Sequence, residues 1–242
     1  MYEKDLVTIG EAAKYLNVAI QTLRRWDASG KLQARRSAGG HRYYRREDLK
    51  RFVLDLSALG LAWASSAQPP ELPSEYYCER HDRFTSRVEK MGTILLQTDG
   101  ITEEMASLLT LVAAEIGDNS FVHNIGSWPD VPGIFFAYDI GKRVIVLADR
   151  GQGVRTTLRR VRPDLETDAD ALRIAFTEII SGRDPEKRGN GLKVVRRTTE
   201  SGPIGLQFRS GLGVVQIPKF PGLMEIRTAA NNIRGVYAVI TF

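Results

Sequence analysis

The first thirty residues have apolar positions at helical spacing. Thr8 and Glu11 have the spacing of a capping box, and the apolar residues after Thr8 recur at intervals of three and four, which predicts a short helix. A second helical pattern over residues 19–30 turns its apolar positions inward: Ile20, Leu23 and Trp26. Because polar and basic residues occupy the outer face of this second helix, the pattern indicates a helix-turn-helix.

Residues 31–53 contain two short basic segments around Gly39-Gly40, followed by a helical pattern that begins near Arg46. Glycine pairs are favoured at hairpin tips, because both positions require backbone angles that other residues rarely adopt. Basic residues flank this tip: Arg35, Arg36, His41 and Arg42. The pattern predicts a wing, which is a β-hairpin that reaches DNA phosphates or a minor groove.

A long helical pattern over residues 102–124 has an inner stripe that mixes apolar and polar side chains. The stripe runs through these positions: Leu108, Val112, Glu115 or Ile116, Asn119 and His123. Burying a carboxylate, an amide and an imidazole without partners is costly. We therefore expect these polar groups either to pair with one another or to line a ligand site.

Two glycine-rich turns follow this helix. The apolar strands predicted at 133–139 and 143–149 end in the turn DRGQG, at 149–153, where glycines let the backbone approach a ligand closely. After a helical pattern at 171–180, the segment RGNGL, at 188–192, opens another helix. The free N–H groups and the positive dipole end at such a helix N-terminus suit phosphates.

The segment LSALGLAWASSAQPPELPSEY, at 56–76, divides the chain. Its prolines exclude a continuous helix: Pro69, Pro70 and Pro73. We expect three parts: a domain at 1–56, a linker at 57–75 and a second domain at 76–242. The linker is more apolar than a free linker requires, so three residues should pack on their own domain or on a partner subunit: Leu59, Leu61 and Trp63.

The excess positive charge is confined to the first quarter of the chain. Residues 1–55 contain twelve Lys and Arg against seven Asp and Glu, whereas the remainder contains 22 of each. This distribution is expected if only the first part meets a phosphate backbone. The single cysteine, Cys78, excludes an internal disulfide framework, and no apolar run reaches the roughly 20 residues of a membrane-spanning helix. We expect a cytoplasmic protein that does not bind a membrane.

The first fifty residues resemble a known DNA-binding domain. The order TIGEAAKYLNV, TLRRW, GKL and RRSAGGHRYYRREDL is similar to the winged helix-turn-helix of the MerR and excisionase superfamily, including the variant found in some transposon recombinases. The resemblance implies double-stranded DNA as the partner, contacted by Thr22, Arg24, Arg25, Arg36, His41, Arg42 and Tyr43. Because so small a module neutralises only a few phosphates, we expect a homodimer.

Three motifs occur in a recognisable order after residue 76: EIGDNSFVHN, then DRGQG, then RGNGL. This order resembles the Asn box and the two glycine boxes of the GHKL ATP-binding fold, the Bergerat fold, which histidine kinases, DNA gyrase, the MutL repair proteins and anti-sigma-factor kinases share. The resemblance implies a two-layer α/β sandwich at 76–242 and, with the winged helix-turn-helix, an α+β protein. It also implies ATP and Mg²⁺ as cofactors.

The GHKL resemblance implies a role for each motif residue. Asn119 would coordinate Mg²⁺ between the phosphates, Asp149 would accept from the adenine amino group, and Glu115 occupies the place of the general base. Other residues would form the rest of the ATP site: Gly151 and Gly153 in the adenine pocket, and Lys187, Arg188, Gly189, Asn190 and Gly191 in the phosphate lid. Gly235-Val236 stands where the family often has Gly-Thr.

Three functions fit these domains. The first is a bacterial transcriptional regulator in which Mg-ATP binding, with or without slow hydrolysis, alters DNA or partner binding through two states of a dimer. The second is a serine/threonine kinase of the anti-sigma type, which acts on a partner such as a STAS-like protein. The third is an accessory DNA-binding ATPase of a mobile element.

Overall fold

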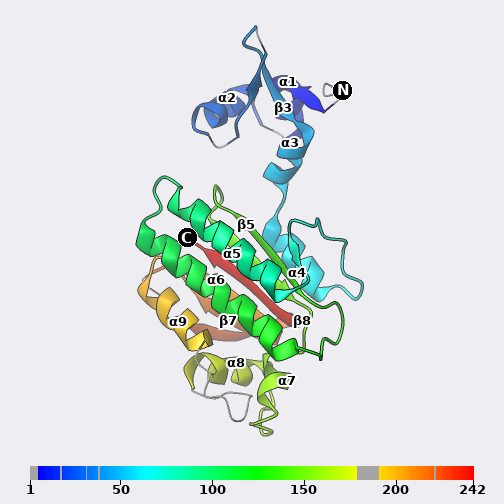
Figure 1. Cartoon of the computed structure of the whole chain (residues 1–242), viewed down its shortest axis with the longest axis vertical. Helices are drawn as coiled ribbons and strands as arrows, with labels where there is room; N and C mark the ends of the chain where they lie inside the picture. The colour runs from blue at the N-terminus through cyan, green and yellow to red at the C-terminus, as the bar shows by residue number, and fades with distance from the viewer. Residues whose placement is uncertain (1–4, 17, 31, 38, 179–190, 221) are drawn as a thin grey trace. The chain divides into compact units, whose positions relative to one another are not determined.

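The computed structural model describes residues 5–16, 18–30, 32–37, 39–178, 191–220 and 222–242. The chain divides into two compact units, Met1–Asp55 and Leu56–Phe242 (Figure 1). The α+β class agrees with the expectation from the sequence, and the second unit contains an antiparallel sheet with helices. Among the described residues, no helix is both long and apolar enough to span a membrane.

Unit 1 contains the helix-turn-helix and the hairpin where the sequence pattern predicts them. Its elements in chain order are β1 (Leu6–Thr8), α1 (Ile9–Tyr15), α2 (Ile20–Ala28), β2 (Arg35–Arg36), β3 (Arg42–Arg45) and α3 (Arg46–Val53). The strands form an antiparallel sheet in the order β1-β3-β2. The strand β3 therefore joins the wing hairpin to the start of the chain.

The predicted capping box begins α1. The backbone N–H of Thr8 donates to Glu11 Oε2 at 2.8 Å, and the backbone N–H of Glu11 donates to Thr8 Oγ1 at 3.3 Å, which satisfies two free donors of the first turn. The helices and the wing share a core centred on Leu23, Tyr44 and Leu49. Ile20 was expected inside but is 41% exposed, because it is the first residue of α2 and lies beyond this core.

Unit 2 is built on a five-stranded sheet in which all neighbouring strands are antiparallel. Its order is β4-β5-β6-β8-β7, with bounds β4 (Tyr77–Cys78), β5 (Ile134–Asp139), β6 (Val144–Asp149), β7 (Gly205–Ile217) and β8 (Glu225–Thr241). The long β7–β8 hairpin shifts register between Ser210 and Gly213. Such irregularities bend a strand locally, and this one lies where β8 passes the end of β6.

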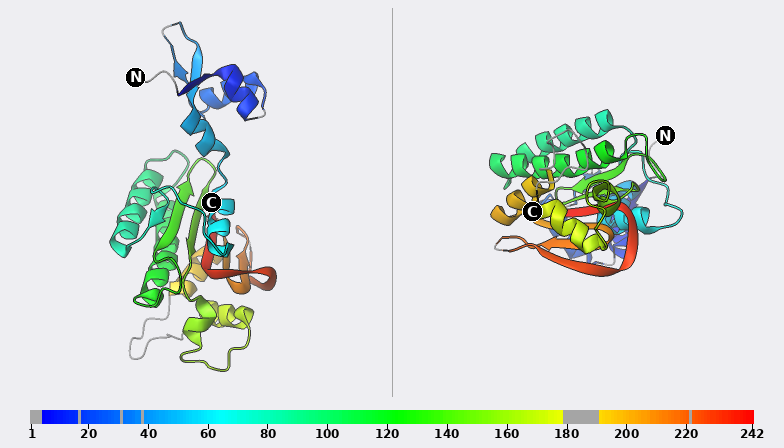
Figure 2. Two further views of the ribbon diagram at one scale, coloured as in Figure 1. Left: turned by 90° about the vertical axis from the view of Figure 1, so that its right-hand side faces the viewer. Right: turned by 90° about the horizontal axis from the view of Figure 1, so that it is seen from below.

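Helices cover both faces of this sheet (Figure 2). The helices α5 (His81–Leu96), α6 (Glu103–Asn124) and α9 (Gly191–Ser201) share a core with Phe136 and Leu147. The helix α4 (Leu56–Ser65) instead contacts Phe135 and Val146 through Gly60. Because successive side chains of a strand point to opposite faces, α4 packs on the face opposite α5 and α6.

The segment expected to be a linker is therefore partly a structural helix. Residues 57–65 belong to α4, which packs on β8, β6 and β5 with Trp63 and Ala64 buried. An added Cβ at Gly60 would lie 2.9 Å from Val146 Cγ1, so the backbone of α4 approaches the sheet closely. The apolar run forms a buried helix here because the prolines that interrupt helices begin only at Pro69.

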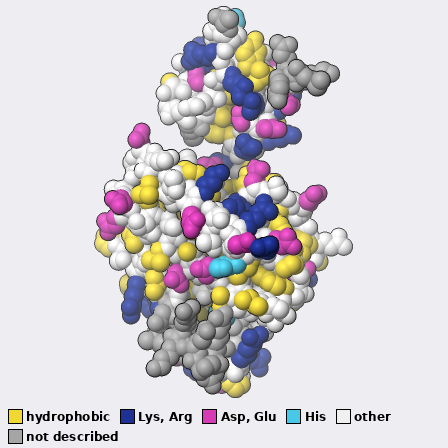
Figure 3. Space-filling view, in the orientation of Figure 1, with side chains coloured by type: hydrophobic (Ala, Val, Ile, Leu, Met, Phe, Trp, Pro, Cys, Tyr) yellow, Lys and Arg dark blue, Asp and Glu magenta, His cyan; other side chains and the backbone are white. Residues whose placement is uncertain are grey.

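The remaining helices of unit 2 are α7 (Val154–Leu158) and α8 (Asp168–Thr177). The helix expected at 171–180 thus begins earlier, because Thr167 caps it by accepting from the backbone N–H of Asp170 at 3.1 Å. Residues 179–180 lie outside the described residues. Over α5 and α6, acidic and basic side chains are interspersed on the surface (Figure 3), as the balanced charge of this part of the chain predicts.

Candidate functional site

The outer face of α2 presents the predicted DNA-contacting residues of the helix-turn-helix. Arg24 and Arg25 are exposed, while Thr22 is half-buried. The inner side of the same helix is anchored by Leu23, which is fully buried. A helix with two exposed guanidinium groups on its outer face is suited to the major groove, where arginine forms paired hydrogen bonds with guanine.

The wing is attached to α2 through one carboxylate. Asp27 Oδ2 accepts from Arg42 Nε at 2.6 Å and from Arg36 Nη2 at 2.9 Å, and its Oδ1 accepts from the backbone N–H of Ala34 at 2.9 Å. The hydrogen bond from Ala34 and the two arginines lower the pKa of Asp27. Two predicted wing residues, Arg36 and Arg42, are therefore held in place by the end of α2.

The two tyrosines of the wing point in different directions. Tyr44 is 1% exposed, and its hydroxyl donates to the carbonyl of Leu23 at 3.4 Å. Tyr43 alternates with it along β3 and is half-buried, and His41 is exposed near the hairpin tip. Tyr43 and His41 thus remain accessible to a ligand, as do the exposed Arg35 and Arg36, whereas Tyr44 belongs to the core.

In unit 2, α6 buries the expected Val112 and Ile116 but not the polar residues expected with them. The buried polar residues are Ser120 and Asn124, whereas Glu115, Asn119 and His123 are half-buried beside them. At this end of the helix, the buried stripe is shifted by one position from the expected one. The helix is apolar over a broad face, so spacing alone does not show which side of that face lies toward the core. The half-buried residues therefore border the core and remain reachable from outside it.

Glu115 and Asn119 meet the beginning of α9. A Cβ added at Gly191 would lie 2.6 Å from Glu115 Oε2 and 3.1 Å from Asn119 Nδ2. Residues from two distant parts of the chain are thus brought together, and any larger side chain at position 191 would require Glu115 to shift. Burial raises the pKa of Glu115, and the neighbouring charge of Asp118 raises it further.

The carboxylate of Asp149 lies at the end of β6 and is 1% exposed. Its Oδ2 accepts from Ser120 Oγ at 2.6 Å, and its Oδ1 accepts from the backbone N–H groups of Gly151 at 2.8 Å and Val236 at 3.2 Å. All three of these donors are neutral. Burial raises the pKa of Asp149 to about 6, although the hydrogen bonds act in the opposite direction.

The loop after Asp149 packs tightly against the end of α6. Asn124 Oδ1 accepts from the backbone N–H of Gln152 at 2.9 Å, and a Cβ at Gly151 would overlap the Asn124 amide. Gly153 has a φ of +77°, which favours glycine. Gly235 has a φ of +58°, and a Cβ there would overlap Asp149 Oδ1. Glycines thus allow three backbone segments to converge on one carboxylate.

The structure brings together five of the predicted ATP-site residues in two adjoining clusters: Glu115, Asn119 and Gly191 in one, and Asp149 and Gly151 in the other. Ser120, the chain neighbour of Asn119, bonds to Asp149 and joins them. The other predicted lid residues lie outside the described residues: Lys187, Arg188, Gly189 and Asn190.

Sequence reasoning missed Ser120, Asn124 and Arg150 as parts of this region. Ser120 and Asn124 continue the helical spacing of Ile116, so a rotated stripe would have included them. Arg150 lies within the DRGQG motif and is fully buried, with hydrogen bonds to Asp130 and to the carbonyls that follow α4. Its burial has no signal in the sequence, because its partners are about twenty and eighty residues away.

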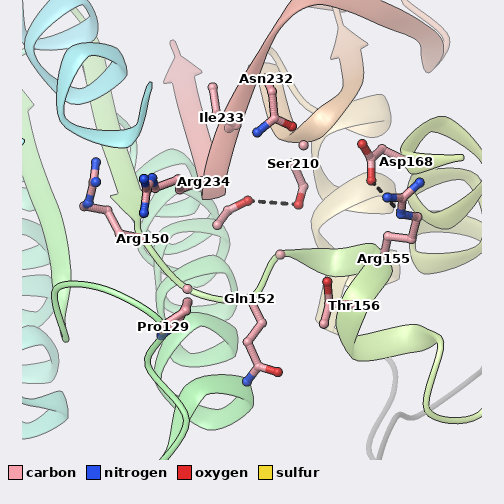
Figure 4. Close-up of a pocket in the computed structure, with 14 residues that line it drawn as sticks. Pro129, Arg150, Gln152, Arg155, Thr156, Asp168, Ser210, Asn232, Ile233 and Arg234 are labelled. Carbon is pink, nitrogen blue, oxygen red and sulfur yellow. Dashed lines mark hydrogen bonds and ion pairs between the residues drawn. The ribbon is translucent and has the colours of Figure 1, made fainter. Parts of the chain in front are cut away.

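A cavity of about 290 Å³ lies beside the same loop (Figure 4). Arg150 and Arg234 line one end, and the ion pair of Arg155 with Asp168, at 3.1 Å, lines the other. Ser210 lies between them and donates to the carbonyl of Gly235 at 2.9 Å. The residues that line this cavity include the two loop glycines but, within the described part of the chain, no residue of α6.

Comparisons with known proteins identify the first unit. Residues 8–44 match the MerR family regulatory protein, and this segment contains both helices of the helix-turn-helix and most of the wing. The chain is also similar to the type II methyltransferase M.Eco47II of Escherichia coli, with 42% identity over 50 residues. That similarity covers 20% of this chain and only 12% of the methyltransferase. Residues 8–44 therefore form a MerR-family DNA-binding region, which suggests a transcriptional regulator.

Proposed function

We propose that this protein is a DNA-binding transcriptional regulator whose binding to DNA or to a partner is controlled by Mg-ATP in a GHKL-type domain at residues 76–242. The MerR-family region at 8–44 supports the DNA-binding part. The observation that carries the nucleotide-binding part is the convergence of Glu115, Asn119 and Gly191, which come from two separate motifs and meet at the start of α9.

The chemistry of these residues fits Mg-ATP. Gly191 begins α9, so its backbone lies at a positive helix end that suits phosphates, and the amide oxygen of Asn119 beside it is the kind of ligand that Mg²⁺ accepts together with phosphate oxygens. Asp149 lies at the other end of the region and is surrounded by neutral donors. It would accept from the adenine amino group, with Gly151 and Gly153 shaping the pocket.

DNA contact is assigned to α2 and the wing. Arg24 and Arg25 would read base edges from the exposed face of α2. Arg36, His41, Arg42 and Tyr43 would contact the backbone from the wing. Since so small a unit neutralises only a few phosphates, the active form would be a homodimer, and occupancy of the nucleotide site would alter the affinity of that dimer for DNA.

The test is a titration of the purified full chain with DNA from upstream of its own gene, with and without Mg-ATP. We expect Mg-ATP to change the DNA affinity at least about fivefold, the lower end of usual allosteric coupling. The change should vanish in Asn119→Ala and persist in Asn231→Ala, whose side chain is exposed on β8. If the wild type binds Mg-ATP but its DNA affinity stays constant, control through DNA affinity is refuted.

A protein kinase of the anti-sigma type is a second candidate, favoured by the raised pKa of Glu115. A carboxyl group in this position would accept the proton of an attacking serine hydroxyl or of a water molecule. Incubation with γ-labelled ATP and a STAS-like protein from a neighbouring gene separates the two functions. Transfer of label that is lost in Glu115→Gln supports the kinase, and only slow release of phosphate supports the regulator.

A further inference from the structure

The helix α4 is the first element of unit 2, since the chain passes from unit 1 to unit 2 between Asp55 and Leu56. This helix is therefore the part of unit 2 that directly follows the chain leaving unit 1. Each end of α4 is hydrogen-bonded to a residue that is a chain neighbour either of Asp149 or of a residue that donates to the Asp149 carboxylate.

Arg150, the residue after Asp149, holds the C-terminal end of α4. Its guanidinium donates to the carbonyl of Trp63, to the carbonyl of Ser66 at 2.9 Å and to that of Ala67 at 3.4 Å. The last carbonyls of a helix have no partner within the helix, and a cation at this end is favourable. Arg150, which lies in the DRGQG loop, thus caps the C-terminal end of α4.

Asp130 compensates the buried charge of Arg150. Its Oδ2 accepts from Arg150 Nε at 2.7 Å, from Arg150 Nη2 and from Arg234 Nη1 at 3.1 Å. The side chain of Arg150 is fully buried, and a buried guanidinium needs such a partner to be tolerated. The guanidinium is therefore fixed on both sides, by Asp130 and by the carbonyls in the last turn of α4 and just after it.

Tyr237 holds the N-terminal end of α4. Its hydroxyl donates to the carbonyl of Ser57 at 3.0 Å. The residue before it, Val236, donates its backbone N–H to Asp149. Arg150 directly follows Asp149, and Tyr237 directly follows Val236, which donates to the Asp149 carboxylate. Both residues that hold α4 are thus chain neighbours of groups at this carboxylate.

We infer that Arg150 is a positioning residue that transmits occupancy of the nucleotide site to α4, an inference that rests on the function proposed above. A base that bonds to Asp149 displaces or tightens the hydrogen bonds from Gly151 and Val236. The neighbouring Arg150 and Tyr237 then move or stiffen with their backbones, and α4 responds at both ends. Coupling follows a continuous chain of packed and hydrogen-bonded groups, which connects the site to the start of unit 2.

The test compares hydrogen exchange of α4 and DNA affinity in the full chain, each with and without Mg-ATP. In the wild type, Mg-ATP should slow exchange in residues 56–67 and change the DNA affinity, each at least about fivefold. Arg150→Lys should bind Mg-ATP but lose both responses, because a lysine ammonium does not reproduce the fork of the guanidinium. Arg234→Gln, which alters the other partner of Asp130, should retain both.

Tyr237→Phe is the second variant, to be used if a thermal melt shows that Arg150→Lys is not folded. It removes one hydroxyl and should reduce both responses while leaving Mg-ATP binding intact. Full responses in whichever of these variants folds would overturn the role of Arg150 and α4 while leaving the proposed function in place. A wild type that binds no Mg-ATP would refute the proposed function, and this inference with it.

Discussion

Asp27 in unit 1 and Asp149 in unit 2 both lie at the centre of polar clusters, but their partners differ in charge. Asp27 accepts from Arg36, Arg42 and one backbone N–H, and its pKa is lowered. Asp149 accepts only from neutral groups among its described partners, and burial raises its pKa to about 6. The first is an ion-paired clamp between α2 and the wing, and the second is a buried carboxyl group that accepts hydrogen bonds from neutral donors.

The largest expected effect concerns stability as a function of pH. Because the pKa of Asp149 is raised from 3.8 to about 6 in the folded state, its contribution to stability is fully present below pH 3.8 and is lost as the pH rises through about 6. The loss is about 3 kcal/mol, from about 1.4 kcal/mol per pKa unit. Asp149→Asn should remove this loss, as urea unfolding of the full chain between pH 4 and pH 7 would measure.

Asp27 should show the opposite sign. Its lowered pKa means that its contribution is present above pH 3.8 and is lost as the pH falls through its folded pKa. Asp27→Asn should therefore reduce the decline in stability of unit 1 in acid. If both variants change the pH dependence in the same direction, the contrast between the two carboxylates is wrong.

A smaller effect is expected at Gly191, where a substitution should weaken the proposed nucleotide binding with little effect on folding. Gly191→Ala places a methyl group 2.6 Å from Glu115 Oε2, and the flexible end of Glu115 can move away with little effect on the fold. The methyl group and the displaced carboxylate then occupy the proposed phosphate region. We expect about a tenfold loss of Mg-ATP affinity, or about 1.4 kcal/mol, measured by calorimetry.

Gly141→Ala provides the control for Gly191→Ala, since Gly141 lies in the turn between β5 and β6, with only an ordinary contact to its neighbour Asp139. It should bind Mg-ATP as the wild type does. Equal Mg-ATP affinity in Gly191→Ala and Gly141→Ala would contradict the proposal that phosphates bind at the start of α9.

The smallest effect is expected at the clamp of unit 1. Asp27→Asn removes one negative charge near the wing and releases Arg36 and Arg42. Affinity for nonspecific DNA should rise about two- to threefold, because surface charge acts on all sequences alike, while the preference for the specific site falls. Asp48→Asn removes an equal charge from α3, so it should raise nonspecific affinity without changing the preference. Equal preference in both variants would show that the clamp does not position the wing.

Much of unit 1 was predictable from the sequence. The capping box at Thr8, the helical spacing around Leu23 and the glycine pair of the wing are local signals, and each led to the element that the structure contains. The two strands before Asp149 were predictable for the same reason. The exposure of Ile20 and the rotated stripe of α6 were not, because the direction of a helix face depends on its neighbours.

The sequence by itself determined the local elements, the basic character of unit 1 and the order of three motifs after residue 76. The tertiary structure decided that residues 57–65 form a packed helix, that Arg150 is buried, and that Glu115 and Asn119 meet Gly191. Helix caps and hairpin tips arise from interactions over a few residues, so a short stretch encodes them. The burial of an arginine or an aspartate depends on partners tens of residues away, and only the folded chain brings those partners together.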